Sequence, residues 1–315
     1  MLGFLLRKLP EVLLVAVASS VIGFMLPRLA PGDPAVSVAG SDATPDQLAA
    51  VRDAMGLNKP VVQQYADWVA NALHGDFGQS FVMNRPVGQV ILARAESTLE
   101  LAALATILML LIGFTLGILA GGDRSRIARV VLDALTTVCL ATPPFLTGLI
   151  LIVIFGIVWP IFPVSGEVGM SEDPWLSLKF LLLPALALAL PQAAVIARLL
   201  ASSMQATAAE DFVDLACAKG VPQRTIVRRH ILRNSLGSAI IVSGLRIGEL
   251  LGGAIVMEAI FARNGLGSLA VYAIQSRDYN VLQALIILSV LIAVLIQLLS
   301  EILLAALDPR IRLGA

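Results

Sequence analysis

Charged side chains are scarce in this chain, at 14% of its 315 residues against roughly a quarter in ordinary soluble domains. Hydrophobic residues make up 58%, and the mean hydropathy is +0.88. This composition excludes an ordinary water-soluble domain and predicts an integral membrane protein. The 22 basic and 22 acidic residues cancel, so the positions of the charges are more informative than the net charge.

Cysteine, histidine and the common catalytic motifs are also rare or missing. The two cysteines, Cys139 and Cys217, have no neighbour at metal-ligand spacing, so neither a disulfide framework nor a metal site is expected. No lysine follows a glycine, so the chain contains no phosphate-binding loop of the form G-x-x-x-x-G-K-[ST]. H-E-x-x-H and G-x-S-x-G are missing as well, and we assign no catalytic residue.

Long apolar runs dominate the sequence instead. A membrane-spanning helix needs roughly 20 mostly apolar residues, and the backbone must be helical because lipid offers it no hydrogen-bond partner. Pro143 and Pro144 interrupt one run, and Pro184 and Pro191 another, so kinks are expected there. The six predicted spans cover about residues 9–29, 97–121, 130–158, 180–200, 236–260 and 281–307.

Lysine and arginine gather in four segments that a six-span chain places on one side of the membrane. The outward segments, 31–96 and 160–177, are acidic on balance. Because cytoplasmic segments carry an excess of basic residues, both termini are predicted to be cytoplasmic, with the first helix retained rather than cleaved as a signal peptide. The basic residues are Arg7, Lys8, Arg124, Arg126, Arg129, Lys219, Arg224, Arg228, Arg229, Arg233, Arg310 and Arg312.

The outward segment 31–96 contains two helix patterns. In the first, Thr44 is the predicted N-cap, Pro45 occupies the first helical position, and Gly56 marks the end. In the second, residues 61–75 place apolar side chains at helical spacing and predict an amphipathic helix on a membrane or protein surface.

The segment EDFVDLACAKGVPQRTIVRRHILRN, Glu210 to Asn234, is polar between two apolar runs. Its pattern predicts two short helices: acidic residues begin the first, Gly220 ends it, and Pro222 begins a second that finishes in basic residues. Two interpretations stand at this point. The segment is either a solvated basic loop that sets topology and touches anionic lipid, or a rigid surface on which another protein docks.

Within this segment, the core A-x-A-K-G and the ending R-H-x-L-R-N resemble the cytoplasmic EAA loop of binding-protein-dependent ABC importer permeases, most closely the B-type permease of dipeptide and oligopeptide importers. In the general EAA pattern Asp214 stands at the Glu position, Ala216 at the second Ala and Gly220 at the Gly, whereas Arg233 replaces the usual Pro. Asn264 also stands where these permeases usually have proline. Further resembling stretches are RLAPGDP (28–34), residues 56–81, RPVGQVI (85–91), STLELA (97–102), MEAIFARNGLG (257–267) and SRDYNVLQA (276–284).

The resemblance implies an all-α integral membrane protein of the type I ABC importer permease fold, with an extracytoplasmic helical segment between its first two spans. It also implies two regions: 1–96, with the first helix and the outward segment, and 97–315, a five-helix core with a coupling loop at about 202–235. An ATPase subunit would hold this loop, with ATP and Mg bound in partner subunits and no cofactor in this chain. The residues assigned to ATPase coupling are Glu210, Asp214, Ala216, Ala218, Lys219, Gly220, Pro222, Arg224, Arg228 and Arg229.

The implied function is that of the transmembrane permease subunit of an ATP-driven importer of di- or oligopeptides in a bacterial plasma membrane. The expected partners are a second, homologous permease subunit, two ATP-binding subunits, an extracytoplasmic peptide-binding protein and membrane lipid, without nucleic acid. Two alternatives stay open. The same machine could import nickel complexes, glutathione or another small solute, or the chain could be an ATP-independent secondary transporter or channel.

The fifth predicted span contains small and charged residues together. Gly244, Gly248 and Gly252 recur every four residues and permit close helix packing, within the chain or against a second permease subunit. Arg246 and Glu249 stand three apart in the same span. Ions in a span pair with one another or face a cavity, so this pair is either structural or part of a polar pathway for the substrate.

Overall fold

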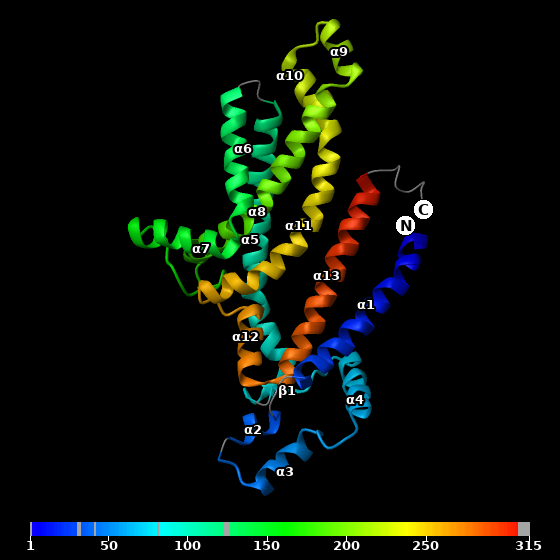
Figure 1. Ribbon diagram of the computed structural model, residues 1–315, viewed down its shortest axis with the longest axis vertical. Coiled ribbons are helices and arrows are strands. Elements are labelled where there is room, and N and C mark those ends of the chain that lie inside the picture. The colour runs from blue at the N-terminus through cyan, green and yellow to red at the C-terminus, as the bar shows by residue number, and fades with distance from the viewer. Residues whose placement is uncertain (1, 30–32, 41, 81, 123–125, 308–315) are drawn as a thin grey trace. The chain divides into compact units, whose positions relative to one another are not determined.

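The computed structural model of the protein is built almost entirely of helices (Figure 1). Arg124, Arg310 and Arg312, which contributed to the predicted orientation, lie outside the described residues, so the cytoplasmic location of both termini stays a prediction. The residues that the structure describes are 2–29, 33–40, 42–80, 82–122 and 126–307.

Four helices among the described residues are long and apolar enough to cross a membrane. A fifth crossing results if α6 (Arg126–Ala141) and the following α7 (Pro144–Ile152) with the π-helix η1 (Val153–Val158) count as one bent span. In α1 (Leu2–Leu29) the apolar stretch is shorter, Val12–Leu26, so the count of six spans stays a prediction. The four long helices are α5 (Val87–Gly122), α8 (Pro174–Ala208), the continuous helix Gln223–Ile260, and Tyr279–Ile296 within α13 (Tyr279–Leu307).

Prolines act differently in the two runs that they interrupt. Pro143 precedes α7 and Pro144 occupies its first position, and neither has an N–H with which to continue α6. The chain therefore bends by 105° between α6 and α7, which stands across α6 in Figure 1, and the run is not one straight span. Pro184 and Pro191, in contrast, lie inside α8, which continues through both.

The chain divides into two compact units. The first holds Met1–Glu96 and Asn264–Leu295, and the second holds Ser97–Arg263 and Ile296–Ala315. Residues 264–295, which the sequence placed with the permease core, thus cluster with the N-terminal region. The division into 1–96 and 97–315 stays a prediction of domain organisation.

In the first unit, the residues after α1 form α2 (Pro34–Ala39), α3 (Pro45–Ala54) and α4 (Val61–Leu73). The predicted start of α3 is confirmed, because Thr44 and Gln47 form a reciprocal capping box and Pro45 occupies the first position. The rest of this unit contains α12 (Leu266–Ser276) and a hairpin in which β1 (Gln79–Ser80) pairs antiparallel with β2 (Arg85–Pro86).

The amphipathic helix α4 packs its aromatic side chains against the end of α1. The ring of Phe24 lies 5.2 Å from that of Tyr65 and 5.8 Å from that of Trp68 between centroids. Tyr65 Oη also forms a 2.7 Å hydrogen bond with Ser20 Oγ. The predicted helix is therefore confirmed, and the surface that it covers is protein.

In the second unit, α8 occupies the centre and packs against α6, α7 and α11 (Arg233–Ile260). Its approach to α5 is close at three glycines of α5. A Cβ atom built on Gly113, Gly117 or Gly121 would lie within 3.0 Å of an α8 atom. At one end of α8 and α11 stand α9 (Asp211–Ala218) and α10 (Gln223–Thr225), which belong to the polar segment (Figure 1).

Candidate functional site

The first half of the polar segment is a short helix with a tightly specified end. Glu210 is the N-cap of α9, and Asp211 and Asp214 lie in the first turn, where negative charge suits the helix dipole. At the other end, Gly220 N–H donates to the Cys217 carbonyl at 3.0 Å and Val221 N–H to the Ala216 carbonyl at 3.2 Å. These two bonds form a Schellman motif.

Gly220 adopts the backbone conformation that this motif needs. Its φ is +74°, in the left-handed region that L residues with a side chain rarely adopt. A Cβ built on Gly220 would meet nothing within 4 Å, so the backbone conformation and not crowding selects glycine here. The prediction that Gly220 ends the first helix is confirmed.

One face of α9 packs into the core of the second unit, and the opposite face is exposed. Val213 and Ala216 are buried in the core of the second unit. Phe212 and Leu215, three residues apart, are 41% and 56% exposed. The sequence did not predict this exposed pair. Phe212, Val213, Leu215 and Ala216 are all apolar, and their spacing alone does not show which two face the core. An exposed apolar pair on a polar segment is typical of a protein-interaction surface.

The sequence predicted that the second half of the segment forms a separate short helix, and this prediction is wrong. After Pro222, α10 leads into the π-helix η2 (Ile226–Leu232), which continues directly into α11. Ile226 and Ile231, which lie within η2, are both buried. The whole stretch Gln223–Ile260 is one helix, so no flexible linker separates the segment from the span.

Most residues assigned to the coupling loop lie at its surface, where a partner could reach them. Ala216 is the exception, since it is buried as a hydrogen-bonding member of the Gly220 turn. The exposed members are Glu210, Asp214, Ala218, Lys219, Gly220, Pro222, Arg224, Arg228 and Arg229.

Arg246 and Glu249 form an ion pair on α11. Arg246 Nη1 lies 2.7 Å from Glu249 Oε2, and the two side chains are 31% and 51% exposed. Gln192 of α8, which the sequence did not connect with them, donates to Glu249 Oε2 at 3.2 Å. A charge exposed to hydrocarbon is costly, so a half-exposed pair in mid-span needs water or protein around it.

The glycines next to this pair do not all serve close packing. Gly244 is buried, and a Cβ on Gly248 would lie at an ordinary 3.7 Å from Ile296. Gly252 has open space around it. The tight contact of α11 with α8 is at Gly253, where a Cβ would lie 2.8 Å from Leu188.

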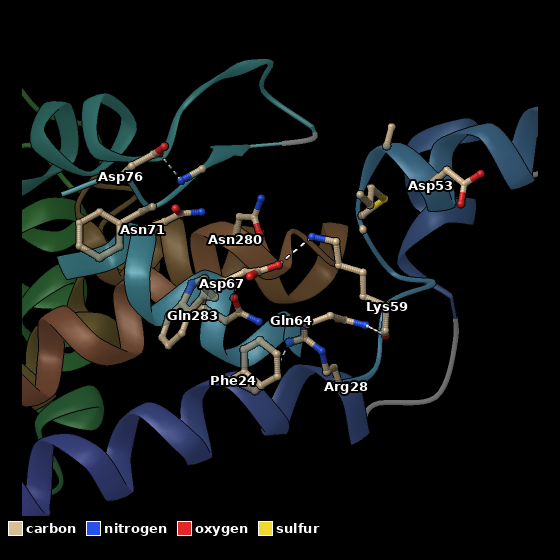
Figure 2. A pocket seen from close by; sticks show the side chains of 16 residues that line it. Phe24, Arg28, Asp53, Lys59, Gln64, Asp67, Asn71, Asp76, Asn280 and Gln283 are labelled. Carbon is tan, nitrogen blue, oxygen red and sulfur yellow. Dashed lines mark hydrogen bonds and ion pairs between the residues drawn. The ribbon is translucent and has the colours of Figure 1, made fainter. Parts of the chain in front are cut away.

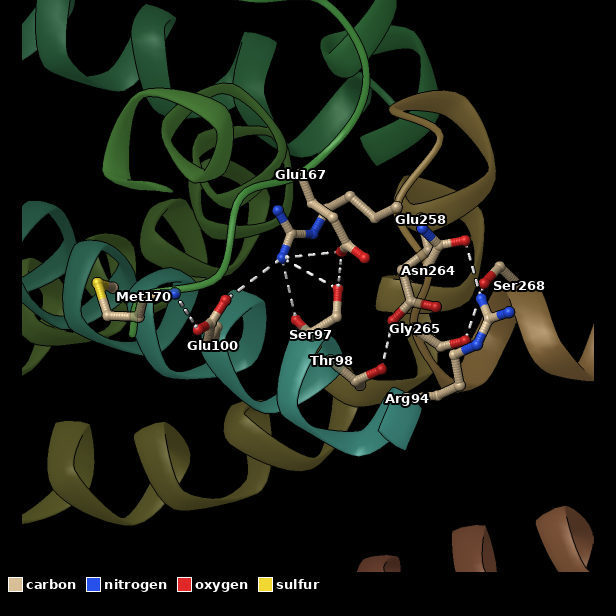
Figure 3. A network of polar contacts seen from close by, with 11 residues as sticks. Arg94, Ser97, Thr98, Glu100, Glu167, Met170, Glu258, Asn264, Gly265 and Ser268 are labelled. Atoms are coloured by element: carbon tan, nitrogen blue, oxygen red, sulfur yellow. Dashed lines mark hydrogen bonds and ion pairs between the residues drawn. The ribbon is translucent and has the colours of Figure 1, made fainter. Parts of the chain in front are cut away.

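The second unit also contains a buried ionic network that sequence reasoning missed (Figure 3). The side chain of Arg263 is 0% exposed, and its Nη2 lies 3.6 Å from carboxylate oxygens of both Glu100 and Glu167. The same nitrogen donates to Ser97 Oγ at 3.0 Å. Burial lowers the pKa of Arg263, and the carboxylates of Glu167, Glu100 and Glu258 act in the opposite direction. The network joins the segment around Glu167 to α5.

No group of three or more histidine, cysteine, aspartate and glutamate side chains in the described part of the chain could hold a metal ion. Cys139 and Cys217 are both free thiols. The features that bear on function are therefore the polar segment, the mid-span ion pair and the buried network.

Comparison with known proteins agrees with this arrangement. The family described as binding-protein-dependent transport system inner membrane component matches residues 113–313, and the corresponding N-terminal family matches residues 1–102. A putative peptide transport system permease protein of Brucella abortus is 34% identical over 312 residues, which covers 99% of each chain. A glutathione transport system permease protein of Salmonella choleraesuis is 36% identical over 312 residues, again with 99% of each chain covered.

Solved structures show the same fold at lower identity. The MetNI methionine ABC transporter, solved in inward-facing conformations, contains a chain with a TM-score of 0.55 and 18% identity. The match covers 70% of this chain and 97% of that chain. Because the family matches together cover nearly the whole sequence, the chain belongs to the binding-protein-dependent transport system inner membrane components: it is an integral membrane permease subunit of an ABC importer, not itself an enzyme, and it works with ATPase and substrate-binding protein components.

Proposed function

We propose that this chain is the permease subunit of an importer of di- or oligopeptides in a bacterial plasma membrane, with both termini cytoplasmic. In this proposal it pairs with a second, homologous permease subunit, and two ATPase subunits bind ATP and Mg while this chain binds no cofactor. A binding protein outside the membrane delivers the peptide. The names of the peptide and glutathione permeases that match the whole chain support this class of cargo.

The observation that carries the coupling proposal is the continuity of the helix Gln223–Ile260. A force applied to Arg224, Arg228 or Arg229 acts on the first turns of the same helix that forms the span. Because η2 runs into α11 without an intervening loop, a displacement of the segment is transmitted along the helix and tilts or shifts the span. The Schellman motif at Gly220 fixes the end of α9 next to this helix.

The docking surface combines apolar and basic parts. Phe212 and Leu215 supply exposed apolar area on α9, and the exposed Arg224, Arg228 and Arg229 supply positive charge on the following α10 and η2. We propose that the apolar pair enters a cleft of the ATPase subunit and that the arginines pair with carboxylates at its rim, since charge complementarity at a rim sets register and association rate. A bare topology loop would need no such apolar pair.

The ion pair of α11 is proposed to line the pathway shared with the second permease subunit. Gln192, Arg246 and Glu249 together present donors and acceptors of both charge signs at the middle of two apolar helices. A peptide carries an ammonium, a carboxylate and amide groups, so a lining of mixed polarity can replace water around each of them. Lipid contact at this place is disfavoured by the cost of exposing the charges.

The experiment is ATP hydrolysis by the reconstituted complex of this chain, its partner permease, the ATPase subunits and the binding protein. We expect peptide-loaded binding protein to stimulate hydrolysis, and Arg228→Glu with Arg229→Glu to abolish the stimulation in an assembled complex. The matched control, Arg228→Lys with Arg229→Lys, keeps the charge and should retain most of it. Stimulation by glutathione alone would narrow the cargo to that tripeptide.

The opposite result is equally specific. If no solute stimulates hydrolysis and charge reversal in the loop changes nothing in an assembled complex, ATP coupling through this segment is refuted. An ATP-independent secondary transporter or channel would then be the better description.

A further inference from the structure

A cavity of about 380 Å³ lies within the first unit, and neither the coupling loop nor the polar pair of α11 contributes to it (Figure 2). Its walls come from the end of α1, the connection between α3 and α4, α4 itself, the residues before β1 and the start of α13. Small-molecule sites usually occupy roughly 300–1,000 Å³. The cavity can therefore hold a ligand of the size of an amino acid or a short peptide.

Two nitrogen donors in the wall of this cavity have no partner. Gln283 on α13 is 1% exposed, and its Nε2 makes no hydrogen bond. The indole Nε1 of Trp68 on α4 is also buried and unpaired. A buried donor without a partner is destabilising, and folded proteins satisfy nearly all such groups with protein, water or ligand. Both nitrogens are covered by protein in this structure, so an acceptor in the cavity reaches them only after neighbouring side chains shift.

The positively charged guanidinium of Arg28 also lines this cavity. Arg28, at the end of α1, lies with its guanidinium carbon 3.5 Å from the centre of the Phe24 ring. It donates to the Phe24 carbonyl at 2.7 Å and to Gln64 Oε1 at 3.0 Å, both neutral acceptors. No carboxylate of the described residues forms an ion pair with it. A guanidinium and two N–H donors at one cavity are complementary to a carboxylate.

Negative charge is present in the same cavity but is otherwise engaged or further away. Asp67 pairs with Lys59 at 2.7 Å, and both side chains are about half exposed. In Figure 2, Arg28, Asp67 and Gln283 gather near the centre, whereas Asp53 and Asp76 lie at opposite edges. A ligand that places its carboxylate on the donors can direct a positive group toward Asp67, where that group would compete with Lys59 for the carboxylate.

We propose that this cavity is a binding site for a small zwitterion, an amino acid or a short peptide, on the permease itself. Arg28, Trp68 and Gln283 hold its carboxylate, and Asp67 attracts its ammonium. The proposal goes beyond ATP coupling and does not depend on it, because none of these residues belongs to the coupling loop. Failure of the hydrolysis experiment and failure of this proposal are thus separate results.

The experiment uses the full chain in lipid nanodiscs, labelled with 5-fluorotryptophan. The chain has three tryptophans, Trp68, Trp159 and Trp175, so three ¹⁹F resonances can be assigned from single Trp→Phe variants. Dialanine is added up to about 10 mM, where even a site with a Kd of 1 mM would be roughly nine-tenths occupied. We expect a saturable shift of the Trp68 resonance, with dialanine amide, which lacks the carboxylate, binding at least about tenfold more weakly.

Gln283→Leu distinguishes a binding role from a structural one. Because it replaces an unpaired buried amide by an apolar group of similar size, thermal stability should stay equal or rise, whereas dialanine should bind about 10- to 100-fold more weakly. Gln205→Leu, at an exposed position of α8, is the matched control and should change neither property. The proposal is overturned if dialanine leaves the Trp68 resonance unmoved or if Gln283→Leu binds it normally. It is also overturned if only the binding protein moves that resonance, since the cavity would then be a protein-docking surface.

Discussion

Replacing Gly220 by alanine tests whether the left-handed turn of the coupling loop is needed for docking. At φ +74° an alanine Cβ meets its own backbone, which costs roughly 1–2 kcal/mol. Part of this is offset, because alanine loses less backbone freedom on ordering than glycine. The net cost is about 1 kcal/mol, or about a fivefold shift in the population of the turn. No clash adds to it, since no atom lies within 4 Å of the new Cβ.

The assay is equilibrium binding of the ATPase subunit to the permease pair in nanodiscs, followed by peptide-stimulated ATP hydrolysis. We expect Gly220→Ala to weaken ATPase binding by at most about fivefold, since the strain lowers the affinity only to the extent that the free loop leaves the turn. Gly220→Asn should lose less than about twofold, because asparagine tolerates the left-handed region.

Gly75 provides a matched control in the same chain. It follows α4 with φ +80°, its N–H donates to the Ala72 carbonyl, and Asp76 N–H donates to the Asn71 carbonyl, which repeats the Schellman pattern in the first unit. A Cβ there also meets open space. Gly75→Ala carries the same backbone cost and should leave ATPase binding unchanged. Equal effects of the alanine variants at both glycines, or of alanine and asparagine at Gly220, would refute the reasoning.

Three further predictions concern the second unit. Gly117→Val forces α5 away from α8 and should lower the free energy of unfolding by about 1–3 kcal/mol in thermal denaturation. Its control is Gly122→Ala, whose new Cβ would lie 3.8 Å from the nearest side chain and which should change stability by less than about 0.5 kcal/mol. Arg263→Met leaves the carboxylates of Glu100 and Glu167 without their buried cationic partner and should destabilise the protein by about 3–5 kcal/mol at pH 8. The double variant Arg246→Met with Glu249→Gln should reduce peptide uptake at least about tenfold. Because the ion pair is half-exposed, the free energy of unfolding should change by less than about 1 kcal/mol. Unchanged uptake would show that the pair is only structural.

Features set by neighbouring residues could be predicted from the sequence. Thr44, Pro45 and Gln47 specify the start of α3 through bonds that span three residues, and Gly220 specifies the end of α9 through its own backbone. The membrane class followed from composition, since a chain so poor in charge cannot cover a soluble surface. The polar segment was recognisable because its charge order contrasts with the spans on either side.

What the tertiary structure alone decided depends on residues far apart in the chain. Pro143 with Pro144 ends a helix, whereas Pro184 and Pro191 do not, because α8 is packed by neighbouring helices that tolerate the lost hydrogen bonds. Arg263 meets Glu100 and Glu167 only after folding, and no local pattern predicts an ion pair across such separations.

The same limit applies to α9 and to the cavity of the first unit. Phe212 and Val213 are adjacent and both apolar, yet only Val213 is buried, because the core of the second unit lies on one side of the helix. The cavity joins Arg28 and Gln283, which stand near opposite ends of the sequence. The sequence by itself therefore determined the class of protein, the caps and the turns, since these depend on composition and short-range hydrogen bonds. The tertiary structure decided which surfaces stay bare and which polar groups stay unpaired, since burial depends on where distant segments pack.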